Sequence, residues 1–338
     1  MQKNDLWVVR YSVERRKVYS NITRHREKDI QKILLVEFGD KYSHYREMWD
    51  GASYENIPGF PIHVDFEVVD KCNQSCMMCP RNVATHPGTS YSLNTGRVLN
   101  YEKFKNIIDD GVSKGMLSIN LGAFAEPLLN KRVFEMIKYA HDKGVIDSRL
   151  ITNGLLINKY IDEVFTSGLV NLFFSVDAFS EERYFEIRGK GFNVVKENIL
   201  NIIEEKKRRN TIFPIIRVSF IDMLVNRKEK DEFIRFWREK VDFVDIQVFD
   251  NYDVNITESF DMSKRKKWSC IAPFKRVSIM SDGKILPCCN FFGLNIPIGN
   301  IYENSLDDAW NSEKMQEIRS GIIHDDLDNC SICQRVGQ

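Results

Sequence analysis

Short runs of apolar and β-branched residues alternate with stretches of helical spacing through the middle of the chain. The runs that predict strands are 63–69, 117–122, 148–152, 171–177, 214–221 and 243–249. The stretches that predict helices between them are 101–114, 130–143, 156–167, 192–209 and 227–240. This alternation is typical of parallel βα units, and six strands fit either a partial (βα)6 barrel or a doubly wound sheet. In both folds the loops that follow the strands carry the chemistry.

The pattern changes on either side of this region. Before it, residues 28–38 have the spacing of a helix, and residues 6–9 are apolar enough for a short strand. After it, two alternating runs flank Ser-Asp-Gly at 281–283, which predicts a β-hairpin, and 305–318 predicts a helix. We therefore expect an N-terminal extension, a barrel and a small metal-stapled α+β domain, with the boundaries 1–61, 62–255 and 256–338.

Composition narrows the class of protein. The 338 residues carry 48 basic and 48 acidic side chains, and this balance speaks against a nucleic-acid-binding domain. The apolar runs are too short to span a membrane, and the polar N-terminus lacks a secretory signal. We expect a cytoplasmic protein, where thiols stay reduced, so the eight cysteines are interpreted as metal ligands.

The first group of cysteines follows the first predicted strand. Cys72, Cys76 and Cys79 have the spacing C-x3-C-x2-C. Thiolates prefer iron–sulfur clusters, zinc or copper(I), and structural zinc usually takes four ligands from paired cysteines. Three thiols in one loop can hold three corners of a cubane cluster and leave its fourth iron open. An iron–sulfur cluster is therefore favoured, with zinc as the alternative.

This C-x3-C-x2-C loop resembles the signature of the radical S-adenosylmethionine (SAM) enzymes, and the resemblance extends over about residues 60–338. It implies a partial (βα)6 TIM-like barrel in which SAM chelates the open iron of a [4Fe–4S] cluster. In that family an electron from the cluster cleaves SAM, and the resulting 5′-deoxyadenosyl radical abstracts a hydrogen atom from the substrate. Met78 stands where the family usually has an aromatic residue near the adenine, and its polarizable side chain is able to fill that space.

Further matches follow the later strands. The sequence Gly-Ala-Phe-Ala-Glu-Pro from Gly122 resembles the family's Gly-Gly-Glu-Pro-type motif, which implies that Glu126 receives the amino group of SAM. Asn153, Ser175 and Asp177 end the third and fourth strands. In similar enzymes such groups meet the ribose hydroxyls and the carboxylate of SAM. Capping of the strand ends is the alternative explanation.

Two arginines compete as partners of the SAM carboxylate. Arg188 resembles an arginine found near this point in related enzymes, and Arg217 lies on the fifth predicted strand. If a substrate radical is to lose a proton, a base is also needed. Asp250, after the sixth strand, and Asp177 are the candidates.

The second group of cysteines lies in the C-terminal region. Cys270 and Cys288 flank the predicted hairpin, and Cys330 and Cys333 form a C-x2-C pair that completes four thiolates. Structural zinc is the simple interpretation of such a set. The pattern resembles the twitch domain, a shortened SPASM domain, and this implies one auxiliary [4Fe–4S] cluster held by all four cysteines. Cys289 is left over, either as a small buried hydrophobe or as a hydrogen-atom donor.

The resemblance implies a radical SAM oxidoreductase that dehydrogenates a sugar, cyclitol or other small metabolite, with the auxiliary cluster accepting the second electron. An aminocyclitol dehydrogenase is the family precedent. A peptide-modifying enzyme that makes a thioether, an epimer or an oxidised side chain is the alternative, as is a sugar epimerase that uses Cys289. A zinc-binding interaction protein is the non-enzyme alternative. The expected partners are a small-molecule or peptide substrate and a reductant such as flavodoxin or ferredoxin, with no nucleic acid and no membrane.

Overall fold

The computed structural model describes residues 22–26, 30–82, 95–248, 270–289 and 296–324. Its strands form a ten-stranded sheet in the order β1-β7-β6-β5-β4-β3-β2-β8-β9-β10. The strands are β1 Ile22–Arg26, β2 His63–Phe66, β3 Ser118–Leu121, β4 Asp147–Thr152, β5 Asn171–Ser175, β6 Ile215–Asp222, β7 Phe243–Val248, β8 Arg276–Ile279, β9 Lys284–Leu286 and β10 Gly299–Asn300. Strands β2 to β7 run parallel in chain order, which confirms the six predicted strands and the partial (βα)6 barrel.

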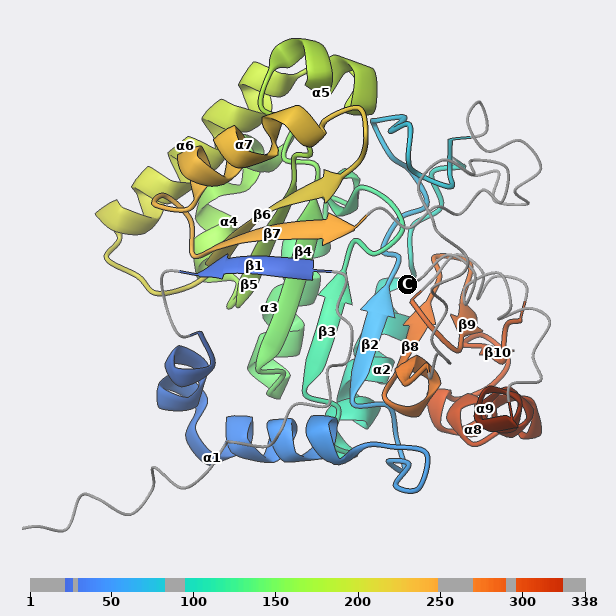
Figure 1. The fold of residues 1–338 in the computed structure, drawn as a ribbon. Coiled ribbons are helices and arrows are strands. Elements are labelled where there is room, and N and C mark those ends of the chain that lie inside the picture. Colours follow the sequence, from blue (N-terminus) through green and yellow to red (C-terminus); the bar gives the residue numbers. More distant parts are fainter. Residues whose placement is uncertain (1–21, 27–29, 83–94, 249–269, 290–295, 325–338) are drawn as a thin grey trace, which may run out of the picture.

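The helices lie along the outer face of the barrel sheet and beyond its edges (Figure 1). They are α1 Ile30–Gly51, α2 Tyr101–Ser113, α3 Val133–Lys143, α4 Ile161–Thr166, α5 Glu181–Arg188, α6 Phe192–Arg208, α7 Lys230–Trp237, α8 Leu306–Trp310 and α9 Glu313–His324. Short 3-10 turns precede α4 and α7 at Ile157–Tyr160 and Arg227–Glu229, and others lie at Pro127–Leu129 and Ala272–Phe274. The predicted helix 305–318 is divided into α8 and α9, and α5 was not predicted.

Alternation along the strands separates two environments. On β2, Val64 and Phe66 belong to the main apolar core. The alternate residues, His63 and Asp65, make polar contacts with other strands. The same alternation recurs on β3 to β7, because neighbouring residues of a strand point to opposite faces. The apolar face packs under the helices, and the polar face forms the inner wall of the barrel.

Helix α1 covers the end of the barrel where the strands begin. Ile30, Leu34 and Tyr45 pack with Ile215 and Phe243 in an apolar cluster that also includes the residues directly before β2, β3, β4 and β5. A kink at Gly39 divides α1 into two parts. The first part agrees with the predicted helix 28–38, and the second, which was not predicted, crosses below the sheet (Figure 1). Because this end is closed by α1, chemistry is left to the opposite end, where the strands finish.

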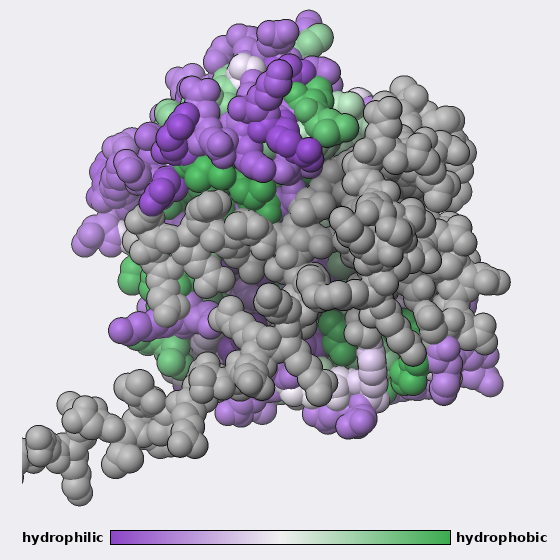
Figure 2. All heavy atoms as spheres, in the orientation of Figure 1, coloured by the Kyte–Doolittle hydropathy of each residue, from purple (hydrophilic) through white to green (hydrophobic). Residues whose placement is uncertain are grey.

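The C-terminal region continues the barrel sheet. Strand β8 pairs in parallel with β2, and the predicted hairpin forms between β8 and β9. The proposed boundary at 255/256 lies outside the described residues, as does the possible strand 6–9. Helices α5 to α7 present a mostly hydrophilic surface on one face of the molecule (Figure 2). Among the described residues, every helix is too short or too polar to traverse a bilayer.

Candidate active site at the carboxyl ends of the strands

The loop after β2 carries Cys72, Cys76 and Cys79, and all three thiols line one cavity of about 280 Å³. The backbone N–H of Met77 donates to the Ile187 carbonyl at 2.8 Å, which ties the loop to α5. Within the described part of the chain, no three His, Cys, Asp or Glu side chains are already arranged around a metal ion position. Burial raises the pKa of each of the three thiols.

Three predicted SAM contacts, Met78, Asn153 and Ser175, line the same cavity. Met78 is buried in one apolar cluster with Cys76. Asn153 follows β4, and its Nδ2 donates to Oδ1 of Asn73 in the cysteine loop at 2.7 Å. The structure therefore brings residues from three different loops to one place, which is what the parallel βα pattern predicts.

Glu126 is buried beside this cavity, in the loop after β3. One carboxylate oxygen accepts a hydrogen bond from Thr152 Oγ1 at 2.7 Å, and the other accepts from the backbone N–H of Asn153 at 2.8 Å. Burial raises the pKa of Glu126 to about 7, and these hydrogen bonds only partly oppose the shift. Gly122 opens the same loop with φ +103°, and a Cβ there would lie 2.3 Å from the Ile151 carbonyl. Glycine is therefore required at this close approach.

Arg188 also lines the cavity, and its guanidinium is paired with Asp177. The guanidinium Nε donates to Asp177 Oδ2 at 2.8 Å, and its Nη1 lies 3.6 Å from Cys76 Sγ. The other oxygen of Asp177 accepts the backbone N–H of Ile221 at 2.8 Å. Asp177 is fully buried and does not line the cavity. Its place in the structure is that of a residue that positions Arg188.

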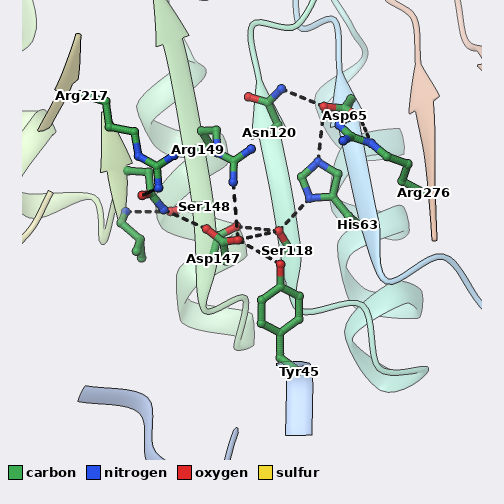
Figure 3. A network of polar contacts seen from close by, with 12 residues as sticks. Tyr45, His63, Asp65, Ser118, Asn120, Asp147, Ser148, Arg149, Arg217 and Arg276 are labelled. Carbon is green, nitrogen blue, oxygen red and sulfur yellow. Dashed lines mark hydrogen bonds and ion pairs between the residues drawn. The ribbon is translucent and has the colours of Figure 1, made fainter. Parts of the chain in front are cut away.

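Arg217 lies elsewhere, which corrects its prediction as a SAM contact. It stands near the start of β6, where its Nη2 donates to Asn171 Oδ1 at 3.1 Å and its guanidinium covers the Phe243 ring. These residues line a different cavity of about 170 Å³ beneath α1. Figure 3 shows Arg217 among the polar side chains of that region. Of the two competing arginines, the structure places only Arg188 beside the cysteine loop.

The sequence analysis missed two residues of the site, Arg81 and Thr152. Arg81 lines the cavity, and its charge acts to lower the pKa of Cys72 and Cys79 against the larger effect of burial. The available signal was its position, two residues after Cys79. Thr152 ends β4 and donates to Glu126. Its signal was its place at a strand end, directly before Asn153.

Comparison with known protein families decides what this arrangement is. Residues 66–234, half of the chain, match the model of the Radical SAM superfamily. The chain belongs to the radical SAM superfamily. Residues 270–335 match SPASM, an iron–sulfur cluster-binding domain. The cofactors of this radical SAM enzyme are therefore SAM, a [4Fe–4S] cluster and auxiliary iron–sulfur, as the motifs predict.

Curated relatives share part of this radical SAM chain. The GTP 3′,8-cyclase of Thermodesulfovibrio yellowstonii is 26% identical over 188 residues, which cover 54% of this chain and 55% of the relative. The GTP 3′,8-cyclase of Alkaliphilus metalliredigens is 26% identical over 209 residues, covering 61% and 59%. The chain thus spans just over half of the length of these relatives.

Solved structures share the fold over a larger part of the chain. Streptococcus suis SuiB bound to S-adenosylmethionine aligns with a TM-score of 0.59 and 15% identity, covering 87% of this chain and 74% of SuiB. BtrN in complex with AdoMet and 2-DOIA aligns with a TM-score of 0.52 and 18% identity, covering 78% and 87%. At these identities the likeness establishes a common fold and nothing further.

The SPASM region of this radical SAM protein is described in part. Cys270 and Cys288 are half-buried on either side of the β8–β9 hairpin, and Ser278 Oγ donates to the Cys288 carbonyl at 2.9 Å. Cys289 is exposed, so the prediction of a small buried hydrophobe is wrong. Cys330 and Cys333 lie outside the described residues, and so does the candidate base Asp250.

The described residues fit the cofactors of the family. Three soft sulfur donors surround one cavity, which suits an iron–sulfur cluster with an open iron. A buried carboxylate beside them, at Glu126, suits an amino group. Cys72, Cys76 and Cys79 would hold the cluster, and Glu126 and Arg188 would contact SAM.

Proposed function

We propose that this radical SAM enzyme oxidises a polar small molecule, such as a sugar or cyclitol. The substrate carbon that bears a hydroxyl or amine would lose a hydrogen atom, a base would take a proton, and the auxiliary cluster would serve as acceptor of the remaining electron. When bound, SAM and its cluster supply the hydrogen-abstracting radical. The remaining tasks fall to the residues of the chain, which bind the cofactor, shape the barrel interior and hold the substrate.

The observation that carries the proposal is the polar lining of the cavity at the carboxyl ends of the strands, which includes Gln74, Asn153 and Ser175. Nearer the starts of the strands, the inner wall of the barrel also carries a belt of polar side chains (Figure 3). Each member is hydrogen-bonded or ion-paired to the next, across strands β8, β2, β3, β4, β5 and β6. We name this set the polar belt: Arg276, Asp65, His63, Ser118, Asp147, Asn171 and Arg217. The inner layers of closed TIM barrels are mostly Val, Ile and Leu. The belt lies toward the end that α1 covers, so it does not line the cavity of the cysteine loop. The polar lining of that cavity, at the opposite end, favours a substrate rich in hydroxyl, amine or anionic groups.

The position of the second cysteine group supports an oxidation. Arg276 ends the polar belt in an ion pair with Asp65, and the charges of Cys288 and Cys289 act on its guanidinium. Strand β8, which carries Arg276, pairs directly with β2. The auxiliary cluster would therefore stand at the side of the barrel interior, where it is able to take an electron from a substrate radical.

The cofactor contacts follow from the geometry of the first site. Glu126, held by Thr152 and the Asn153 backbone, faces the cavity as acceptor for the SAM amino group. Arg188, held by Asp177, provides a cation for the SAM carboxylate. Asp250 stays the candidate for the base that takes the substrate proton.

The names of similar proteins give limited support to a small substrate. The curated relatives are cyclases named for GTP, and BtrN was solved with 2-DOIA. SuiB was also solved with the precursor peptide SuiA, with a TM-score of 0.57. We therefore treat a peptide substrate as the competing outcome of the experiment.

The test is an anaerobic incubation of the reconstituted full chain with SAM, dithionite and a panel of sugars, aminocyclitols and nucleotides. Mass spectrometry would follow 5′-deoxyadenosine and the candidate products. The proposal expects a product two hydrogens lighter than its substrate, formed in step with 5′-deoxyadenosine. Modification of a peptide supplied in the same panel, with all small molecules unchanged, would contradict it.

A second candidate is supported by the exposure of Cys289. A thiol that faces the barrel interior is able to return a hydrogen atom to the opposite face of a substrate radical, which inverts the carbon. The thiyl radical then needs one electron, from the auxiliary cluster, and one proton. In deuterated water this route places one deuterium at the inverted carbon, whereas oxidation gives the lighter product. If Cys289→Ala leaves an observed inversion intact, this candidate is wrong.

A further inference from the structure

We propose that Glu67 is a positioning residue that fixes Arg81 beside the SAM-binding cluster and couples it to the β8–β9 hairpin of the SPASM region. Arg81 and Glu67 together would set how easily that cluster is reduced. The inference depends on membership in the radical SAM superfamily, and it is independent of the proposed substrate and of the oxidation.

Glu67 directly follows β2 and is buried. One of its carboxylate oxygens accepts a hydrogen bond from Arg81 Nη1 at 3.0 Å. The other accepts the backbone N–H of Ser281 at 3.1 Å and the Ser281 hydroxyl at 2.8 Å. Ser281 forms the turn of the hairpin between β8 and β9. A single buried carboxylate therefore joins the barrel, the cysteine loop and the hairpin.

Arg81 in turn joins the two loops that surround the cavity. Its guanidinium donates to the backbone carbonyl of Asp70, just before the cysteine loop, and to that of Phe124, in the loop of Glu126. Its side chain is 7% exposed. With its charge neutralised at one edge by Glu67, the guanidinium is held in place by three acceptors from two segments, so its position relative to Cys72 and Cys79 is fixed.

An apolar contact also connects the hairpin to the loop that lines the cavity. Phe124 and Ala123, from the loop that lines the cavity, pack with Met280 and Leu286 of the hairpin. The hairpin that carries Cys288 at its far end thus touches the SAM cavity through Ser281 and through these side chains. The polar and apolar contacts together make the hairpin part of the wall around the first cluster.

The two charges have opposite consequences for the cluster. Reduction adds an electron, so a nearby cation favours it and a nearby anion opposes it. Removing the charge of Arg81 should therefore make the cluster harder to reduce. Removing the charge of Glu67 leaves the Arg81 cation less compensated and should make the cluster easier to reduce. A merely structural contact would not give shifts of opposite sign.

The experiment measures the midpoint potential of the SAM-binding cluster in the reconstituted full chain, without substrate. The EPR signal of this cluster is recognised by its change when SAM is added. The variants are Arg81→Gln and Glu67→Gln, with Arg81→Lys as the variant that keeps the charge. Asp282→Asn is the matched control, because Asp282 lies in the same turn but pairs with Lys284, at 2.9 Å.

We expect a more negative potential for Arg81→Gln, a less negative potential for Glu67→Gln, and little change for Arg81→Lys and Asp282→Asn. Shifts of the same sign in the two glutamine variants would overturn the proposal, and so would unchanged potentials. Iron content and melting temperature, measured on each variant, show that the comparison is between folded, loaded proteins. If Arg81→Gln does not fold, the sign of the Glu67→Gln shift relative to Asp282→Asn decides alone.

Discussion

Asp65 and Glu126 are both buried carboxylates on the parallel strands of the barrel or just after them, and their electrostatic surroundings are opposite. Asp65 receives the guanidinium of Arg276, with Nε at 3.0 Å, and the amide of Asn120 at 2.8 Å. Burial would raise its pKa, but the Arg276 charge and His63 hold that pKa well below the usual range. Glu126 receives neutral donors, and burial raises its pKa to about 7.

This difference in electrostatic surroundings makes Asp65 a structural carboxylate and Glu126 a carboxylate suited to binding a ligand. Asp65 already has its cation, so the polar belt is a closed network that shapes the barrel interior. No ion pair to Glu126 occurs among the described residues, and its cost of burial is reduced by a cationic or hydrogen-bond-donating partner in the cavity. Under the proposed function, the SAM amino group would be such a partner. Two buried carboxylates thus have different roles. Asp65 is part of a structural network because a cation already pairs with it, and Glu126 is free to bind a ligand because none does among the described residues.

Breaking the closed network should have the largest effect on stability. Asp65→Asn leaves the partly buried Arg276 guanidinium, whose side chain is 20% exposed, without its carboxylate. We expect a loss of about 3 kcal/mol of unfolding free energy, the lower end of the cost of breaking a buried pair. Chemical denaturation of the apo protein measures it. The matched control is Asp307→Asn, which removes a partly exposed partner of Lys114 and should cost less than about 1 kcal/mol. A loss for Asp65→Asn as small as that of the control would contradict the closed network.

Loss of the charge of Glu126 should affect SAM binding and not stability. Glu126→Gln keeps the shape of the side chain and removes a charge whose ionised form is disfavoured by burial. We expect unchanged or slightly higher stability of the apo protein at pH 8. SAM binding should weaken about 10- to 100-fold, since a hydrogen bond to a charged group contributes ~1.5–3 kcal/mol. Equilibrium binding of SAM to the reconstituted protein tests this, and tight binding by the variant would refute the assignment of Glu126.

The pH dependence of SAM binding tests the same assignment of Glu126, and the expected change in affinity is smaller. The ionised form of Glu126 accepts the amino group, and its pKa of about 7 means that this form is lost as the pH falls through neutrality. SAM affinity should therefore rise about tenfold between pH 6 and pH 8, following the ionised fraction. Glu126→Gln should flatten this dependence, whereas an equal pH dependence in the variant would assign it to another group.

The fold followed from the sequence where the pattern was local. Strands alternate with helices because apolar runs and helical spacing recur along the chain, and this was enough to place the six parallel strands. Helix α5 was missed because its apolar residues show no helical stripe. Ser180 caps its N-terminus, with Oγ accepting the Arg183 N–H at 3.2 Å, and such a capping signal is weak on its own.

The site followed from the sequence only where motifs are contiguous. The cysteine loop, Gly122, Glu126 and Asn153 lie in or directly after strands, so their place at one edge is a consequence of parallel topology. The contacts of Asp177 and Arg217 were not predicted, because their partners belong to no shared local motif: Arg188 and Ile221 in one case, and Asn171 in the other. The hydrogen-bonded group of Glu67, Arg81 and Ser281 could not be predicted from a local sequence pattern, because Glu67 and Ser281 are 214 positions apart.

The central claim is that one open and one closed cluster act in the same chain. The most direct measurement compares iron content and reductive SAM cleavage, after anaerobic reconstitution, between the natural chain and a variant with Cys72, Cys76 and Cys79 changed to alanine. The natural chain should hold about eight irons and form 5′-deoxyadenosine, and the variant should hold about four irons and form none. A colourless zinc protein, or SAM cleavage that persists in the variant, would contradict the account.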